Sequence, residues 1–224
     1  MTTLPALSKD GSVHVTDEVW NTRISSLGAV LTVCGVSFLL WRSAAMASPV
    51  RVWSFLIYGL GTLSVFVTSA LHHGFHGTPR QDFLLRQADY LAIFLMIAGT
   101  FTPFCLVLVP GPLSTGVLVF VWLLAAAGIA SKALYPALPK WATLAMTIGM
   151  GWVAVVLVPQ VYGALRLAGL VSVAVGGAFF TVGGLIFGLE KPNPLPGRFG
   201  FHEIWHCFVV AGASCHFATM CMCL

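Results

Sequence analysis

The sequence predicts an all-α integral membrane protein built as a bundle of seven transmembrane helices. Of its 224 residues, 58% are hydrophobic and only 8% are charged, whereas soluble domains carry about 25% charged residues. Seven mostly apolar stretches each approach the length of about 20 residues that a helix needs to cross a bilayer. The connections between them are short and contain Pro and Gly, which favour turns. The chain has no room for a separate soluble domain.

Each helix is predicted from one of these apolar stretches, taken in chain order. Glycine recurs within the stretches and permits close contact between helices. A segment of residues 1–23 comes first, and residues 24–224 form a single membrane domain. The leading segment lacks a short apolar core with a cleavage site, so we do not expect a signal peptide. The predicted helices cover residues 24–42, 50–73, 84–109, 113–131, 141–159, 165–188 and 201–222.

The distribution of Lys and Arg predicts the orientation of the bundle. With the N-terminus in the cytoplasm, eight basic side chains fall on the inner side and three on the outer side, as expected because cytoplasmic loops are enriched in Lys and Arg. Seven crossings then place the C-terminus outside. The net charge of +4 is small and spread over loops, so we expect lipid partners and no nucleic acid. The predicted location is the plasma membrane, as a multi-pass protein of the bacterial inner membrane; the sequence does not indicate an oligomeric state.

Immediately before the first predicted helix, Trp20 and Arg23 are typical of a segment at the membrane interface. Glu18 and Asn21 lie in the same segment. Two interpretations stay open for them: solvated loop residues, or residues that cap the bundle.

A metal site is predicted where the second and last helices meet. His202 and His206 are four residues apart at the start of the last helix, so they share one helix face and could share one cation. The second helix ends on the same inner side with His72 and His73, whose side chains point about 100° apart, so only one of them faces the bundle centre. We choose His73 as the third ligand because Ser69, four residues earlier, shares its face.

The remaining histidines are expected to have other roles. His72 and His76 are expected to be interface or loop residues. His216 lies ten residues beyond His206, about 15 Å further along a helix. We expect it to be a hydrogen-bonded packing residue, because it is too far away to share the metal.

Asp89 and Ser69 are the candidate catalytic residues. Asp89 is the only acidic residue inside the second to sixth predicted helices. It either hydrogen-bonds and deprotonates a metal-bound water, or it pairs with Arg86 on its own helix. Ser69 either orients that water and stabilises an oxyanion, or bonds its own helix backbone.

The segment His202-Glu-Ile-Trp-His206 also matches the His-Glu-x-x-His pattern of metalloproteases, in which the glutamate, here Glu203, is the general base. The longer protease pattern needs a histidine where this chain has Gly212, and no later helix can supply another ligand. The match is therefore weak, and Glu203 is as readily a residue that supports a neighbouring helix.

A longer set of motifs carries a more specific resemblance. The motifs lie in order on the second, third and last predicted helices, and with them the chain resembles the hemolysin III family of the progestin and adipoQ receptor group, which includes the adiponectin receptors. The motifs are Ser69-x-x-x-His73, Leu85-Arg-Gln-Ala-Asp89, Ile97-Ala-Gly-Thr-Phe-Thr-Pro103 and Phe199-Gly-Phe-His-Glu-Ile-Trp-His206.

The resemblance implies a zinc ion on the inward side, held by His73, His202 and His206, with Asp89 and Ser69 lining its water. It also implies a relationship to alkaline ceramidases, which are membrane-embedded zinc amidases. The chain departs from the family pattern at Ser25, where a histidine is frequent. It departs again at Tyr90, where histidine is frequent, and at His72, where tyrosine is common.

Three functions follow as expectations. The preferred one is a zinc-dependent hydrolase of a lipid amide or ester, with the lipid entering sideways between helices. The second is a lipid-responsive receptor or regulator of membrane state in which Zn²⁺ is structural. The presence of only three converging histidines argues against this second function, because structural zinc normally has four protein ligands. The third is a cytolysin, for which the sequence offers little support.

Overall fold

The computed structural model describes Lys9, residues 18–222 and Leu224. Most of the predicted N-terminal segment, residues 1–23, lies outside these described residues. In the part of the chain that the structure describes, all regular elements are helical, apart from one isolated bridge between Leu195 and Phe199. The helices are α1 (Glu18–Ala45), α2 (Pro49–Gly74), α3 (Pro79–Pro103), α4 (Pro112–Leu134), α5 (Lys140–Trp152), α6 (Val158–Leu189) and α7 (Phe201–Cys221).

Two short irregular helices continue the main ones. A π-helix, Phe104–Leu108, extends α3, and a 3₁₀ helix, Val153–Leu157, joins α5 to α6. The first helix begins at Glu18 and not at residue 24, so the expected interfacial residues Trp20 and Arg23 belong to its first turns.

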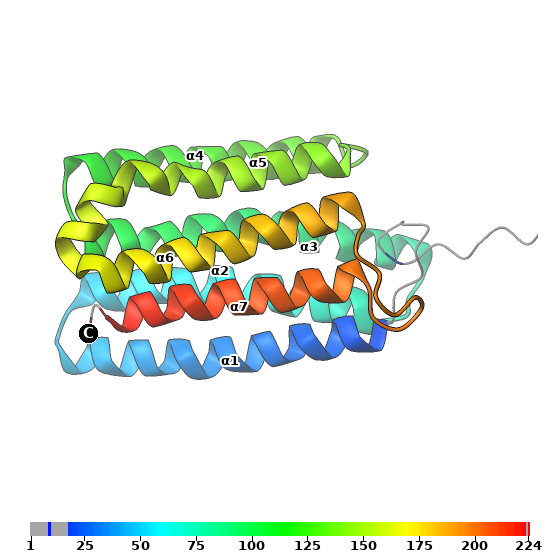
Figure 1. Cartoon of the computed structure of the whole chain (residues 1–224), viewed down its shortest axis with the longest axis horizontal. Helices are drawn as coiled ribbons and strands as arrows, with labels where there is room; N and C mark the ends of the chain where they lie inside the picture. The colour runs from blue at the N-terminus through cyan, green and yellow to red at the C-terminus, as the bar shows by residue number, and fades with distance from the viewer. Residues whose placement is uncertain (1–8, 10–17, 223) are drawn as a thin grey trace, which may run out of the picture.

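Six stretches of the described chain are long and apolar enough to cross a membrane, and the protein is therefore a multi-pass membrane protein, as expected for the bacterial inner membrane. The fifth stretch, Lys140–Leu189, contains 50 residues and includes both α5 and α6. Inside α6, the backbone of Arg166 leaves the helical region, with φ of 57° and ψ of −157°. Figure 1 shows the chain turning back on itself between α5 and α6.

Local sequence explains where the helices begin. Proline occupies the start of α2, α3 and α4, a position at which its missing N–H leaves no helical bond unmade. Thr78 and Gln81 form a reciprocal capping box at the start of α3. At the start of α7, the backbone N–H of Gly200 donates to Glu203 Oε2 over 2.7 Å.

Glycine sets the close packing of α2 against α3. A Cβ atom at Gly61 would lie 2.6 Å from the carbonyl oxygen of Leu95, and one at Gly99 would lie 3.0 Å from that of Ile57. The two backbones are in contact at these positions, and contact that close is possible only for glycine. This packing sets the distance between the middle of α2 and the second half of α3.

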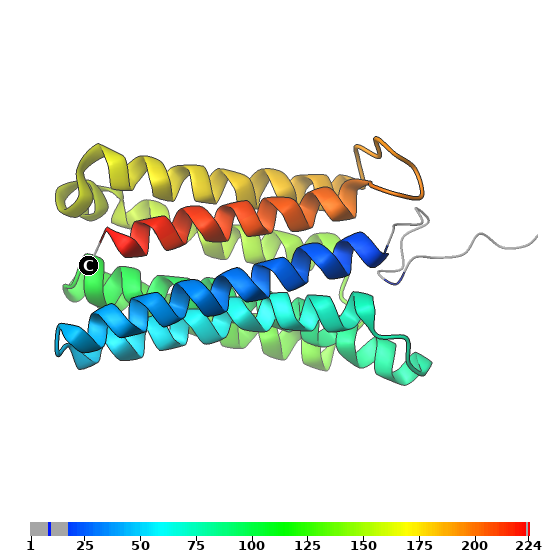
Figure 2. The same cartoon turned by 90° about the horizontal axis from the view of Figure 1, so that it is seen from below.

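The arrangement of the helices gathers distant segments at one end of the bundle. Figures 1 and 2 place the start of α1, the start of α7 and the connection from α2 to α3 at that end, while the C-terminus lies at the other end. The candidate site lies where these segments meet.

Candidate metal centre

Three histidines from two helices come together at the end of the bundle where α7 begins. The ligand atoms of His73, His202 and His206 all lie within 4.8 Å of one another, and all three side chains are buried. His73 is in the last turn of α2, and the other two are in the first turns of α7. The grouping expected from the spacing of these residues is therefore present as a set that could hold a metal ion.

The donor geometry suits a tetrahedral metal. Two nitrogen ligands at about 2.0–2.1 Å from a tetrahedral zinc ion lie about 3.3–3.4 Å apart. The Nε2 atoms of His73 and His206 are 3.3 Å apart. The ring centroid of His202 lies 4.8 Å from that of His73 and 4.7 Å from that of His206. The third imidazole therefore lies beside the space between the other two.

Glu18 contacts the outer side of this histidine set. Its Oε2 accepts a hydrogen bond from His73 Nδ1. With the proton on Nδ1, Nε2 keeps its lone pair for a metal, and carboxylates hold metal-binding histidines in this way in many sites. The interpretation of Glu18 as a solvated loop residue is wrong, because Glu18 lies in α1 and its half-buried side chain contacts His73; Asn21 is fully buried. No local pattern predicts this contact, because 55 residues separate Glu18 from His73.

Asp89 enters the site from α3. Asp89 lies close to His72 and His73, and the possible ligand atoms of the three residues are within 4.8 Å of one another. Thr68 donates to Asp89 Oδ1 over 3.5 Å. Among the described residues, the ion pairs are His73 with Glu18 and Lys140 with Glu190, so Asp89 does not form the salt bridge with Arg86 that was the alternative.

Ser69 lies on the same side of α2 as His73. It is 2% exposed, and its hydroxyl is 2.9 Å from that of Ser25 on α1. Ser69 therefore makes a contact between helices and not only a bond to its own backbone. Ser25 occupies the position where a histidine is frequent in the family that the chain resembles. Here Ser25 contacts Ser69 and does not belong to the histidine set that could hold a metal.

Of the other histidines, His72 departs from the prediction, whereas His76 and His216 lie in the kinds of place that were expected. His72 is buried and borders Asp89, so its assignment to an interface or loop is wrong. His76 is exposed between α2 and α3, as expected of a loop residue. His216 packs against the rings of Phe104 and Phe180, at centroid distances of 5.9 and 5.4 Å.

Glu203 lies beside the site without entering it. One carboxylate oxygen accepts from the Gly200 backbone, and the other, Oε1, is buried with no hydrogen-bond partner among the described residues. The carboxylate thus caps the start of α7. This arrangement does not support the metalloprotease pattern, in which the glutamate must face the metal.

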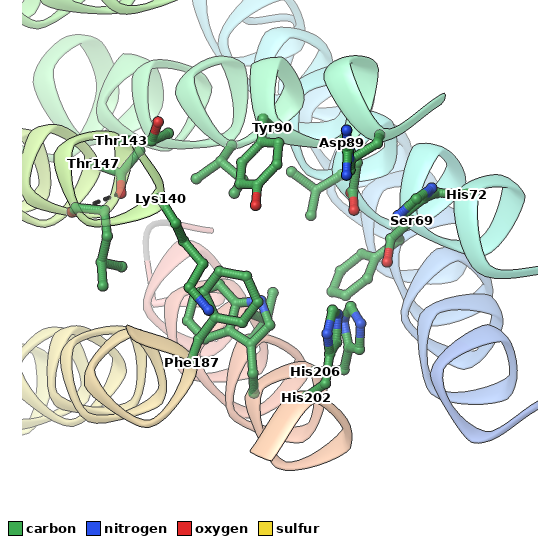
Figure 3. A pocket seen from close by; sticks show the side chains of 17 residues that line it. Ser69, His72, Asp89, Tyr90, Lys140, Thr143, Thr147, Phe187, His202 and His206 are labelled. Carbon is green, nitrogen blue, oxygen red and sulfur yellow. Dashed lines mark hydrogen bonds between the residues drawn. The ribbon is translucent and has the colours of Figure 1, made fainter. Parts of the chain in front are cut away.

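A cavity of about 60 Å³ opens beside the histidines and extends toward α5 and α6. Figure 3 shows the oxygens of Ser69 and Asp89 pointing toward His202 and His206. Tyr90, Lys140 and Thr143 line the far side of the cavity, and sequence reasoning did not assign them to the site. Their positions depend on how α3, α5 and α6 pack, and no local pattern encodes that packing.

Comparisons with known proteins point to one family. Residues 13–217 match the family model described as "Haemolysin-III related". The chain is 32% identical to "Hemolysin-3" of Bacillus cereus over 91% of this chain and 90% of that protein. It is 32% identical to the "Hemolysin-3 homolog" of Bacillus subtilis, over 91% of this chain and 92% of that protein. It is 27% identical to the human "Monocyte to macrophage differentiation factor", over 72% of this chain and 66% of that protein.

Proposed function

The chain belongs to the haemolysin-III related family, and from that premise we propose that it is a zinc-dependent hydrolase of a membrane lipid amide or ester. One observation carries the proposal. Three buried histidines lie within metal-ligand reach of one another, and two of them, His202 and His206, line a cavity together with Asp89 and Ser69. Three protein ligands and an open position are typical of catalytic zinc, whereas structural zinc normally has four.

The residues have distinct roles in this proposal. His73, His202 and His206 would hold the ion, and Glu18 fixes the orientation of His73. Zinc, when bound, lowers the pKa of water to about 7 and polarises a carbonyl group. Asp89 accepts the proton that water loses and passes it to the leaving nitrogen or oxygen, while Ser69 donates a hydrogen bond to the carbonyl oxygen of the lipid. One water is consumed for each amide or ester bond broken.

Burial of the site supports this chemistry. The metal-binding histidines are at most 7% exposed, and Ser69 is 2% exposed. A site with few competing waters strengthens the electrostatic contribution of each fixed donor. We expect the lipid to reach this site from the side, between helices that are long and apolar enough to cross the membrane.

We also propose seven crossings with the N-terminus in the cytoplasm. A continuous helix of 50 residues would extend about 75 Å, more than twice the hydrocarbon thickness of about 30 Å. The stretch Lys140–Leu189 is interrupted by the 3₁₀ helix and by Arg166. One crossing can therefore be made by α5 together with the 3₁₀ helix that follows it, and another by the part of α6 beyond Arg166. The metal centre then lies toward the cytoplasmic face.

Metal content is the first test. The protein is purified in mild detergent without chelators, and its metal is measured by mass spectrometry beside His73→Ala and His202→Ala. Near-stoichiometric zinc that is lost from both variants is the expected result. A wild-type protein without metal would contradict the zinc site. Hydrolysis of lipid amides and esters is then screened, with Asp89→Asn as the variant expected to keep zinc and lose activity.

One observation favours the structural alternative, a lipid-responsive receptor or regulator. The Asp89 carboxylate lies within 4.8 Å of a His73 ligand atom, and in this alternative it would move toward the ion as a fourth ligand. The same variant separates the two functions. Loss of zinc from Asp89→Asn would support a structural ion, whereas retained zinc with lost turnover supports the hydrolase.

A further inference from the structure

A second cavity lies between α1, α2 and α7, beyond the metal centre along the bundle. It has a volume of about 370 Å³, against about 60 Å³ for the cavity at the histidines. None of the residues that line it is charged. Its walls are apolar with a few hydroxyls, drawn from Gly28 to Phe38 on α1, from Tyr58 to Phe66 on α2, and from Val210 to Phe217 on α7.

The shape of this groove follows from small residues on α1. A Cβ atom at Gly28 would lie 2.4 Å from the Phe66 ring, and one at Gly35 would lie 2.9 Å from the Phe217 ring. The two glycines thus accept aromatic rings from α2 and α7. Thr32, between them, lines the groove, and its hydroxyl donates to its own helix at Gly28 O over 2.8 Å.

Phe66 connects the groove to the metal centre. Its side chain is 3% exposed and lines both cavities. One turn of helix beyond it on α2 is Ser69, which contacts Ser25 on α1, and Ser25 is close to one turn before Gly28. The ring of Phe66 therefore lies at the boundary between the cavity at the histidines and the uncharged groove.

The length of the groove matches one leaflet. Its α1 wall runs from Gly28 to Phe38, ten residue steps or about 15 Å along a helix. That is half the hydrocarbon thickness of about 30 Å. The groove begins beside the metal centre, near one end of the helices, and so it extends from that depth toward the middle of the membrane.

We infer that this groove holds the acyl chain of the lipid whose polar bond lies at the histidine cavity, with the Phe66 ring beside the point where the chain passes from one cavity to the other. The inference rests on the proposed function, which places a lipid at the metal centre. An uncharged lining suits a hydrocarbon chain and excludes a charged headgroup, which would be left unpaired in an apolar environment. Because Phe66 lines both cavities, they are neighbours, and one amphiphilic molecule could occupy both.

The test uses a fatty acid that carries a photoreactive diazirine near the middle of its chain, because amide and ester hydrolysis release the same product. Purified protein in detergent is irradiated with this probe, and the labelled peptides are mapped by mass spectrometry. Adducts are expected on the groove-facing parts of α1 and α7. Thr32→Trp fills the groove and should reduce labelling there at least several-fold.

Val33→Trp is the matched control, because Val33 is the next residue on α1, is 51% exposed and does not line the groove. It should leave labelling unchanged. Equal labelling in the two variants, or adducts concentrated on other lipid-facing helices, would overturn the inference. Retained zinc in both variants shows that each still folds.

Failure of the groove and failure of the hydrolase are distinguishable. Labelling is repeated in the metal-free His202→Ala variant, where the groove itself is intact and adducts should persist. Groove labelling without turnover of any lipid amide or ester would contradict the hydrolase alone. Turnover with labelling elsewhere would contradict the groove alone.

Discussion

Glu18 is the residue whose role depends most on the folded structure. It comes from the first turn of α1, yet its carboxylate contacts His73 at the end of α2. A carboxylate in this position holds the imidazole in one tautomer and raises its basicity toward the metal. In the proposed metal site, the strength of metal binding therefore depends on α1, a helix that supplies no ligand.

Replacing Glu18 by Gln tests that dependence. We expect zinc to bind about 10–100-fold more weakly, the usual effect of removing such a partner, with the helical content unchanged. Competition with a zinc chelator measures the affinity. Glu190→Gln is the control, because Glu190 pairs with Lys140 and contacts none of the three histidines in the described contacts. Equal affinities of the two variants would show that Glu18 does not act on the metal site.

Ser69→Ala tests the donor beside the histidines. If the hydroxyl stabilises charge on the lipid carbonyl oxygen, kcat should fall about 10²–10³-fold, and zinc content should not change. Ser64→Ala is a matched control one turn and a half earlier on α2, where the hydroxyl only bonds the Gly61 carbonyl at 2.7 Å. A parallel loss in both variants would indicate a general effect on α2.

At this scale, helical spacing was enough to predict the three histidines, because residues four apart share a face and the direction of each helix fixes the depth of its end. Spacing could not identify Glu18 or the buried His72. Both depend on which face of α2 meets α1 and α3, and adjacent histidines give no local indication of that. Lys140 and Thr143 were missed for the same reason, since they reach the cavity from α5.

Among the elements, the α2–α3 pair determines the shape of the site, because it carries His73, Ser69 and Asp89. The backbones touch at Gly61 and Gly99. The apolar stretches predicted these two helices well. The apolar stretches were less informative about α5 and α6. The sequence there is apolar almost throughout, so its pattern does not indicate the 3₁₀ segment or the break at Arg166.

Gly61→Ala should separate α2 from α3. Its added methyl would meet backbone 2.6 Å away, which cannot shift without moving a helix. We expect a lower melting temperature in detergent and a partial loss of zinc. Gly177→Ala is the matched control, since a Cβ there meets nothing within 4 Å; it should leave zinc unchanged and stabilise α6 by about 0.5–1 kcal/mol. Unchanged zinc in Gly61→Ala would show that the helix spacing is not critical.

For the whole molecule, the number of crossings decides where the C-terminus lies. With seven crossings and a cytoplasmic N-terminus, alkaline phosphatase fused after Leu224 should be active, because the enzyme needs the outer compartment. A fusion within residues 190–200, between α6 and α7, should be inactive. A fusion near Gly163 should again be active. If the stretch Lys140–Leu189 crossed only once, the last two expectations could not both hold.

The contact between Glu18 and His73 also has a consequence for how the protein is made. The first helix to leave the ribosome supplies the carboxylate, and the last one supplies two of the three histidines. A nascent chain released before α7 would hold one histidine and no site. In the proposed zinc protein, the metal can therefore be bound only after α7 has been made, so zinc uptake would report that α1, α2 and α7 have assembled.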